Sequence, residues 1–231
     1  MAASRPTPRT AGRVALLAGA TGLIGRALLP LLLAGDRYGA VHVLLRRAVP
    51  GIEPQPKLTL HTVDFARLPQ PFPAVDDVFI ALGTTIKVAG SRAAFRQVDF
   101  DFVVNTARAA RAAGAARLAV VSALGADAQS RVFYNRVKGE MQATVAALGY
   151  ASVTFAQPSL LMGDRAALGQ PQRPGEVWAA RLLAPVMGLI PKGVRPIPAG
   201  VVAIAMLTAN LSGRPGVHIL ASGQMQTSAS R

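Results

Sequence analysis

Short apolar runs alternate with longer amphipathic segments along most of this chain. The runs have the length and composition of buried strands, and they cover residues 13–20, 41–47, 57–65, 77–85, 117–125 and 150–159. Apolar positions at helical spacing separate several of them, at residues 23–35, from about Ser91 to residue 115, and at 131–149. Because strands separated by helices join as right-handed crossovers, this order predicts an α/β fold. Its doubly wound parallel sheet would be covered by helices on both faces.

The pattern loosens after about residue 160, where glycine and proline become frequent. Further elements are predicted as helices at 175–189 and 199–211 and as a short strand at 217–221. We expect one domain over residues 13–231, in which the segment after about residue 160 forms a small, variable C-terminal cap. Residues 1–12 are expected to form a flexible basic arm.

The composition indicates a folded, soluble protein. Of the 231 residues, 51% are hydrophobic and 16% are charged, which excludes a disordered chain. No apolar stretch reaches the roughly 18 to 20 residues that a membrane span requires, and the start of the chain lacks the apolar core of a secretory signal. The absence of cysteine excludes disulfides and thiolate chemistry. We therefore expect a cytoplasmic enzyme or binding protein without a membrane span.

The net charge of +14 raises the alternative of a nucleic-acid-binding protein, because clustered cations release counterions from phosphates. The distribution of the charge disfavours this alternative. Most of the cations are arginines that lie singly or in pairs, and aromatic residues are not interleaved with them. We expect no specific nucleic-acid partner.

Three glycines, each three residues from the next, mark the junction of the first strand and the first helix. Gly19 allows a tight turn, Gly22 lets the backbone approach a pyrophosphate, and Gly25 permits close packing of helix on strand. The free N–H groups and the dipole of the helix start favour an anion. A dinucleotide site is therefore predicted, with turn and packing roles alone as the alternative. Pro30, inside the following helix, is expected to kink that helix or cut it short.

The end of the second strand indicates which dinucleotide is bound. An NAD site usually has a carboxylate there, about 20 residues beyond the glycines, whereas an NADP site accommodates the 2′-phosphate with arginine. This chain has Arg46 and Arg47 at that point and no adjacent acid. We therefore expect NADP(H) rather than NAD(H), with one of these guanidinium groups on the phosphate. The alternative is that the two arginines simply end a strand.

Two further strand ends carry candidate cofactor contacts. Asp64 follows the third strand, where it would accept a hydrogen bond from the adenine amino group or serve as a turn residue. Gly83 closes the fourth strand, where a residue without a side chain permits close approach of the cofactor.

The candidate catalytic residues are Ser122, Tyr134 and Lys138. Tyr134 and Lys138 stand four residues apart on a predicted helix and so share one face. Ser122 ends the preceding strand at the carboxyl edge of the sheet, where open α/β sheets bind ligands. A nearby ammonium favours the phenolate form of a tyrosine, so Tyr134 would exchange a proton with an alcohol or carbonyl while hydride moves. Lys138 would bond the nicotinamide ribose, and the Ser122 hydroxyl would orient the substrate oxygen.

An ordered set of motifs runs from about residue 13 to 221 and resembles the short-chain dehydrogenase/reductase superfamily. More narrowly, it is similar to the atypical branch related to the mammalian Tat-interacting protein, whose bacterial members are often labelled nucleoside-diphosphate-sugar epimerases. The motifs are GATGLIG, the Arg46-Arg47 strand end, VDFDFVVNTARAA, VSALGAD, FYNRVKGE, and LMGDR followed by RPGE. The resemblance implies a Rossmann domain that binds NADP(H), with Ser122, Tyr134 and Lys138 in the catalytic roles.

The motif positions, together with the residues discussed above, define the expected cofactor contacts. These are Gly19, Thr21, Gly22, Leu23, Ile24, Gly25, Arg46, Arg47, Asp64, Phe65, Ala81, Leu82, Gly83, Thr84, Val121, Tyr134, Lys138, Pro158, Ser159 and Leu160. No metal site is expected.

The chain departs from the family pattern in three places. Relatives commonly have two adjacent serines where this chain has Ser122-Ala123, and an Arg-Pro-Gly motif where it has Gln157-Pro158-Ser159. The C-terminal part is also short, at about 70 residues, which disfavours sugar-nucleotide epimerase activity.

Two functions are consistent with these observations. The first is a cytoplasmic NADPH-dependent oxidoreductase that acts on a small carbonyl or alcohol, and the second is a non-catalytic NADPH-binding redox sensor or interaction protein. A monomer or a homodimer is expected, and the pattern does not identify the substrate.

Overall fold

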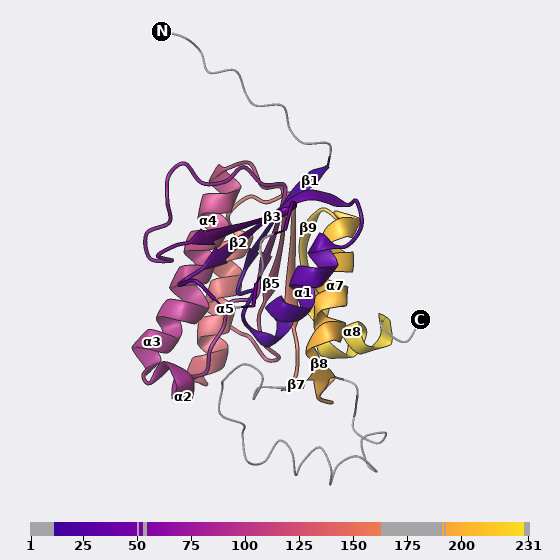
Figure 1. Cartoon of the computed structure of the whole chain (residues 1–231). Helices are drawn as coiled ribbons and strands as arrows, with labels where there is room; N and C mark the ends of the chain where they lie inside the picture. Colours follow the sequence, from indigo (N-terminus) through magenta and orange to yellow (C-terminus); the bar gives the residue numbers. More distant parts are fainter. Residues whose placement is uncertain (1–11, 50, 53–54, 163–190, 192, 229–231) are drawn as a thin grey trace.

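Seven parallel strands form the central sheet of the protein. The computed structural model describes residues 12–49, 51–52, 55–162, 191 and 193–228. The strands are β1 (Arg13–Ala18), β2 (Tyr38–Leu45), β3 (Leu58–Thr62), β4 (Asp77–Ile80), β5 (Arg117–Val121), β6 (Ser152–Gln157) and β9 (Gly216–Ala221). Their order is β3-β2-β1-β4-β5-β6-β9, and each neighbouring pair is parallel (Figure 1). The predicted α/β fold of Rossmann type is therefore confirmed.

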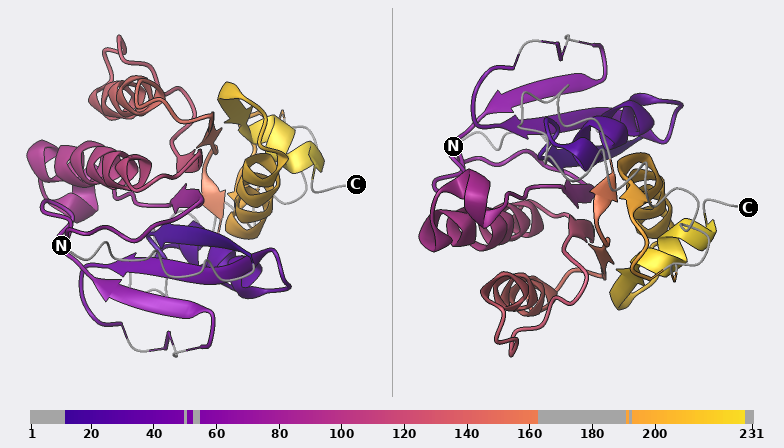
Figure 2. Two further views of the ribbon diagram at one scale, coloured as in Figure 1. Left: turned by 90° about the horizontal axis from the view of Figure 1, so that it is seen from above. Right: turned by 90° about the horizontal axis from the view of Figure 1, so that it is seen from below.

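Helices cover both faces of this sheet. One face is covered by α1 (Leu23–Leu33) and α7 (Ala199–Ser212), and the other by α4 (Phe102–Ala112) and α5 (Phe133–Ala146) (Figure 2). Four shorter helical segments are α2 (Ile86–Ala89), α3 (Arg92–Arg96), the π-helical turn η1 (Gln97–Asp101) and α8 (Ser222–Ser228). A separate two-stranded sheet consists of β7 (Leu161–Met162) and β8 (Ile197–Pro198). Within the described residues, every helix is too short or too polar to cross a bilayer.

The core consists of two apolar clusters, one on each face of the sheet. Along β1, Ala15 and Leu17 belong to the cluster beneath α1 and α7, whereas Leu16 and Ala18 belong to the cluster beneath α4 and α5. Because successive side chains of a strand point to opposite faces, a central strand with helices on both sides is apolar at every position. This explains the uninterrupted apolar runs of the sequence.

The helices differ from expectation in two respects. Helix α1 continues past Pro30 to Leu33, because Leu28 and Leu32 on either side of the proline are completely buried against the sheet. The single long helix expected from Ser91 is divided into α3, the π turn η1 and α4. The extra residue in a π turn changes which side chains face the sheet, and here it accompanies a buried carboxylate, that of Asp99. The expected arm at 1–12 and the expected helix at 175–189 lie, except for Gly12, outside the described residues.

A buried aspartate joins four strands at the amino edge of the sheet. Asp77, at the start of β4, accepts hydrogen bonds from Arg13, from Arg117 Nε at 2.9 Å and from the Tyr38 hydroxyl at 2.9 Å. Burial raises the pKa of this carboxyl above its ordinary value, and the bonds from Arg13 and Tyr38 oppose that shift. The four side chains come from the first residues of β1, β2, β4 and β5, so this cluster fixes the register of the central strands.

A pair of histidines connects β2 and β3 near the outer edge of the sheet. His42 Nδ1 and His61 Nε2 lie 2.8 Å apart, so one imidazole donates to the other. Burial lowers the pKa of His42, with a further contribution from His61, and burial also lowers the pKa of His61. The folded protein therefore binds fewer protons at this pair than the unfolded chain does near pH 6.5.

The histidine pair should make the folded state less stable in mild acid. Because the unfolded chain binds the additional protons, the free energy of unfolding rises with pH through this range and falls as the pH drops below about 6.5. We expect the free energy of unfolding in urea to be lower at pH 5.5 than at pH 7.5, and this difference to be smaller in His61→Gln. His218→Gln leaves the pair intact and should keep the wild-type dependence. An unchanged dependence in His61→Gln would exclude the pair as its source.

Candidate active site

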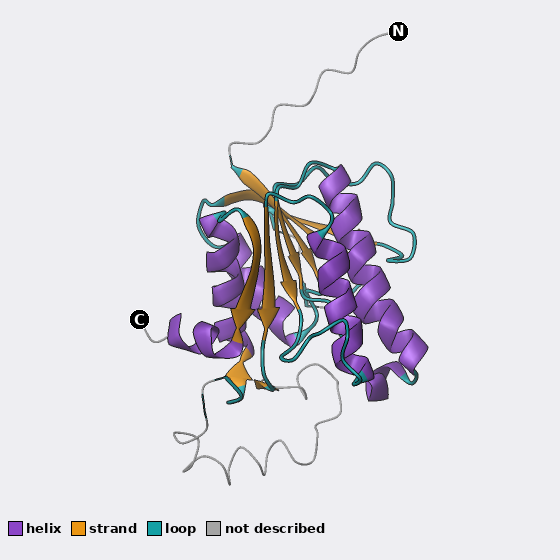
Figure 3. Cartoon of the chain, turned by 180° about the vertical axis from the view of Figure 1, so that it is seen from behind, coloured by secondary structure: helices purple, strands orange, loops and turns teal. Residues whose placement is uncertain are grey.

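A cleft opens at the carboxyl edge of the sheet. Figure 3 shows the arrowheads of the strands pointing toward this edge. The volume of the cleft is about 260 Å³. The residues that line it are Gly22, Leu23, Ile24, Ala81, Leu82, Gly83, Thr84, Thr85, Val88, Asp99, Val121, Ser122, Ala123, Tyr134, Lys138, Pro158, Ser159, Leu160 and Leu161. The three predicted catalytic residues and part of the predicted glycine loop therefore line the same cleft.

The glycine loop has the close backbone contacts that its spacing predicts. Gly19 has φ +94°, and a Cβ there would lie 2.5 Å from the carbonyl carbon of Ala81, the residue that follows β4. A Cβ on Gly25 would lie 2.0 Å from the Gly19 oxygen, so helix α1 packs directly on the turn. Gly22 differs, because a Cβ there would meet nothing closer than 3.5 Å. Packing within the protein therefore does not require glycine at position 22.

The start of α1 faces the cleft without a side-chain cap. Gly22 is the N-cap residue and carries no side chain to bond the first N–H groups of the helix. Gly22, Leu23 and Ile24 line the cleft at this point. An uncapped helix start beside a residue with free space above its Cα fits the pyrophosphate of a dinucleotide.

Lys138 is buried and paired with an aspartate that the sequence analysis did not select. The Lys138 side chain is 3% exposed, and its Nζ lies 2.7 Å from Asp99 Oδ1. The other carboxylate oxygen of Asp99 accepts a hydrogen bond from the Thr84 N–H at 2.8 Å. Burial by itself lowers the pKa of Lys138, but the charges of Asp99 and Tyr134 and the bond to Asp99 outweigh it, so the net shift is upward. Lys138 is therefore an ammonium at neutral pH.

Asp99 lies within the motif VDFDFVVNTARAA but is not among the predicted site residues. It is completely buried on the π turn η1 and lines the cleft. The signal in the sequence was an acidic residue between the apolar residues Val98 and Phe100 of a predicted helix. An acid in such a position can be buried, and a buried carboxylate needs a cation or hydrogen-bond donors as partners. The sequence does not show that the cation is Lys138, which is 39 positions further along the chain.

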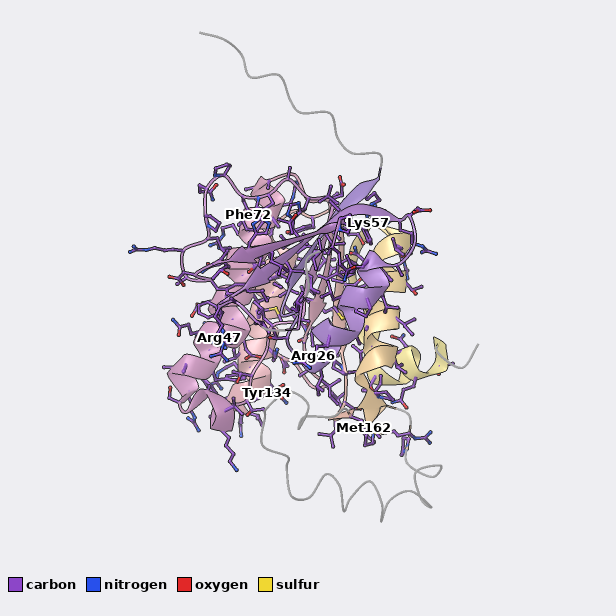
Figure 4. The ribbon with its side chains drawn as sticks, in the orientation of Figure 1. Arg26, Arg47, Lys57, Phe72, Tyr134 and Met162 are labelled. Atoms are coloured by element: carbon purple, nitrogen blue, oxygen red, sulfur yellow. The ribbon has the colours of Figure 1, made fainter. Side chains whose placement is uncertain are left out.

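Tyr134 lies at the beginning of α5 and lines the cleft. Figure 4 shows it in the lower part of the molecule. Its ring packs on Phe95 with 5.2 Å between centroids, and Phe95 is completely buried. The tyrosine ring is thus supported by the core from one side.

The Ser122 hydroxyl also has a partner that the sequence analysis missed. Ser122 directly follows β5 and is 3% exposed, and its Oγ accepts a hydrogen bond from Gln142 Nε2 at 2.6 Å. Gln142 stands eight residues after Tyr134 on α5 and therefore on the same helix face. A search for polar residues continuing the Tyr134 and Lys138 spacing would have found it.

Several predicted cofactor residues lie outside the cleft lining. Arg46 and Arg47 follow β2 and are exposed, and Figure 4 shows Arg47. Asp64 Oδ1 accepts a hydrogen bond from the Ala66 N–H at 2.8 Å, which is the turn role that was its alternative. Phe65 is a core residue whose ring lies 5.7 Å from that of Phe102. Contacts of these residues with a cofactor remain predictions, as do contacts of Thr21, which is exposed.

Substitution of alanine at two glycines should separate folding from cofactor binding. In Gly22→Ala the new methyl group meets only ordinary contacts at φ −79°, so the melting temperature should stay within about 2 °C of wild type. NADPH affinity, measured by calorimetry, should fall at least about tenfold because the methyl group occupies the space beside the pyrophosphate. Gly25→Ala should instead lose about 2 kcal/mol or more of stability, since its Cβ overlaps the Gly19 carbonyl. Wild-type NADPH affinity in Gly22→Ala would show that the pyrophosphate is bound elsewhere.

Comparisons with known proteins agree with this geometry. The model of the NAD(P)H-binding family matches residues 19–160. Protein HTATIP2 of Rattus norvegicus is 35% identical over 167 residues, which cover 71% of this chain and 66% of that protein. Protein fmp52, mitochondrial, of Aspergillus fumigatus is 33% identical over 210 residues, which cover 87% of this chain and 88% of that protein.

A solved structure with the same fold is MoeE5 in complex with UDP-glucose and NAD, with a TM-score of 0.67 and 16% identity. The match covers 94% of this chain and 80% of that chain. At this identity the likeness concerns the fold alone. The family match and the two relatives go further: the chain belongs to the NAD(P)H-binding family and, within it, to the atypical short-chain dehydrogenase/reductases to which HTATIP2 and FMP52 belong.

Proposed function

We propose that the protein is an NADPH-dependent oxidoreductase that transfers hydride to or from a small carbonyl or alcohol. The observation that carries the proposal is that Ser122, Tyr134 and Lys138 line the cleft into which the uncapped start of α1 opens. A hydroxyl, a phenol and an ammonium are the groups that polarise a carbonyl and exchange its proton.

Each side chain has a distinct part in the reduction of a carbonyl. A bound NADPH supplies the hydride to the carbonyl carbon. Tyr134 donates the phenolic proton to the carbonyl oxygen, and Ser122 donates a hydrogen bond to the same oxygen. The Lys138 ammonium stabilises the resulting phenolate, and Asp99 keeps that ammonium in place. In the oxidative direction the same groups act in reverse, with the Tyr134 phenolate as the base.

The reaction can be tested with a panel of aldehydes and ketones, by following NADPH consumption. We expect Tyr134→Phe to lose a factor of about 10² or more in kcat with little change in NADPH affinity, because the ring remains but its proton is lost. Tyr150→Phe is the matched control, since Tyr150 donates to the Ala107 carbonyl away from the cleft and should keep the wild-type kcat. Equal rates in Tyr134→Phe and wild type would remove Tyr134 from the mechanism.

We also propose that NADP(H) is preferred to NAD(H) and that Arg46 and Arg47 bind the 2′-phosphate. Support comes from their exposure directly after β2 and from the absence of an adjacent acid. In calorimetric titrations, the double variant Arg46→Ala/Arg47→Ala should lose at least about tenfold in NADPH affinity and keep its NADH affinity. Arg37→Ala removes an exposed arginine just before the other end of β2 and should leave both affinities unchanged. Tighter binding of NADH than of NADPH by wild type would contradict the preference.

A non-catalytic NADPH-binding protein is the second candidate. It is favoured by the engagement of the Lys138 ammonium with Asp99, which leaves the lysine less free to bind a ribose. Tight NADPH binding without turnover of any member of the carbonyl panel would support this second function.

A further inference from the structure

The Ser122 hydroxyl is held by a side chain that does not line the cleft. Gln142 Nε2 donates to Ser122 Oγ at 2.6 Å, and Gln142 is absent from the cleft lining whereas Ser122 belongs to it. Tyr134, Lys138 and Gln142 are spaced four residues apart on α5. One helix face therefore presents a phenol, an ammonium and an amide in successive turns, and the amide reaches the hydroxyl from outside the cleft.

The direction of this hydrogen bond determines what Ser122 can offer to a ligand. A serine hydroxyl has one hydrogen to donate and two lone pairs that accept. Because Ser122 Oγ accepts from Gln142, the bond to Gln142 does not use the hydroxyl hydrogen. That hydrogen is then available to an acceptor in the cleft, such as the oxygen of a carbonyl.

A second amide fixes the orientation of the first. Gln157 is the last residue of β6, and its Nε2 donates to Gln142 Oε1 at 3.4 Å. With its oxygen turned toward Gln157, the Gln142 amide presents its NH₂ group to Ser122. The reverse orientation would place an acceptor against the hydroxyl and draw its hydrogen away from the cleft.

We propose that Gln142 is a positioning residue that holds the Ser122 hydroxyl as a hydrogen-bond donor to the substrate oxygen, with Gln157 fixing the direction of the Gln142 amide. This inference rests on the proposed function, which assigns a carbonyl oxygen to Ser122. It adds that two neutral side chains, from α5 and β6, set the polarity of that hydroxyl.

The hydrogen bond can be measured without turnover. Acetophenone bound to the complex of the protein with NADP⁺ cannot be reduced, and the infrared frequency of its C=O stretch reports a hydrogen bond to its oxygen. The band should shift to lower frequency in wild type. The shift should become smaller in Ser122→Ala, where only the Tyr134 hydroxyl still donates to the oxygen. It should shrink to the same extent in Gln142→Glu, because the new carboxylate accepts the Ser122 hydrogen. Gln129→Glu adds the same charge at an exposed loop position and should keep the shift.

Kinetics of the same variants separate positioning from a structural effect. We expect Gln142→Glu to lose about 10² in kcat/KM and Gln142→Met to lose less, because methionine removes the anchor but leaves the hydroxyl hydrogen free. In a Ser122→Ala background, Gln142→Glu should cause no further loss, as expected when one residue acts through the other. A structural role would instead give additive losses that follow the melting temperature.

The outcomes distinguish the inference from the proposed function. An unshifted band in wild type, or a wild-type shift in Gln142→Glu, overturns the positioning role even if carbonyls are reduced. A shifted wild-type band whose shift Gln142→Glu reduces as much as Ser122→Ala does, without turnover of any carbonyl, supports the positioning role and rejects the oxidoreductase.

Discussion

The ion pair between Lys138 and Asp99 is the interaction on which the geometry of the candidate site depends. It joins helix α5 to the π turn η1, and the second oxygen of Asp99 joins both to the backbone of Thr84 beyond β4. Burying an ammonium or a carboxylate alone costs several kcal/mol, whereas a buried pair with a further donor compensates much of that cost. Loss of either partner would leave an uncompensated charge beside Tyr134. The Lys138–Asp99 pair therefore holds α5, η1 and the segment after β4 together, and its ammonium is also the group that would stabilise the Tyr134 phenolate.

The π turn η1 is explained by the same ion pair, because Asp99 lies on this turn. The sequence pattern predicts an uninterrupted α-helix from Ser91. The structure instead inserts a wider turn over Gln97–Asp101, and the carboxylate of Asp99 is completely buried within it. A π turn is locally less stable than the α-helix that it interrupts, so it persists only where other contacts compensate for the difference. Such turns are frequent at functional sites.

The amino edge of the sheet carries a stabilising cluster, and the carboxyl edge carries the candidate site. At the amino edge, Asp77 binds side chains from β1, β2 and β5 and so fixes the strands relative to one another. At the carboxyl edge the strands end in loops whose polar groups point into the cleft. In parallel sheets this edge is where ligands bind, because the helix starts that follow the strands are gathered there.

The sequence by itself determined the α/β class, the parallel sheet and the glycine turn, because apolar periodicity and glycine spacing are local patterns that survive without tertiary information. It also selected Ser122, Tyr134 and Lys138, since strand ends and helical spacing are readable along the chain. Only the tertiary structure decided that Asp99 pairs with Lys138, that Gln142 and Gln157 form a chain to Ser122, and that Pro30 is tolerated within α1. These depend on contacts between residues far apart in the sequence, or on packing against the sheet. Helical spacing places Gln142 on the same face as Tyr134 and Lys138. It does not show that Ser122 is the partner of Gln142, because only the fold brings those two side chains together.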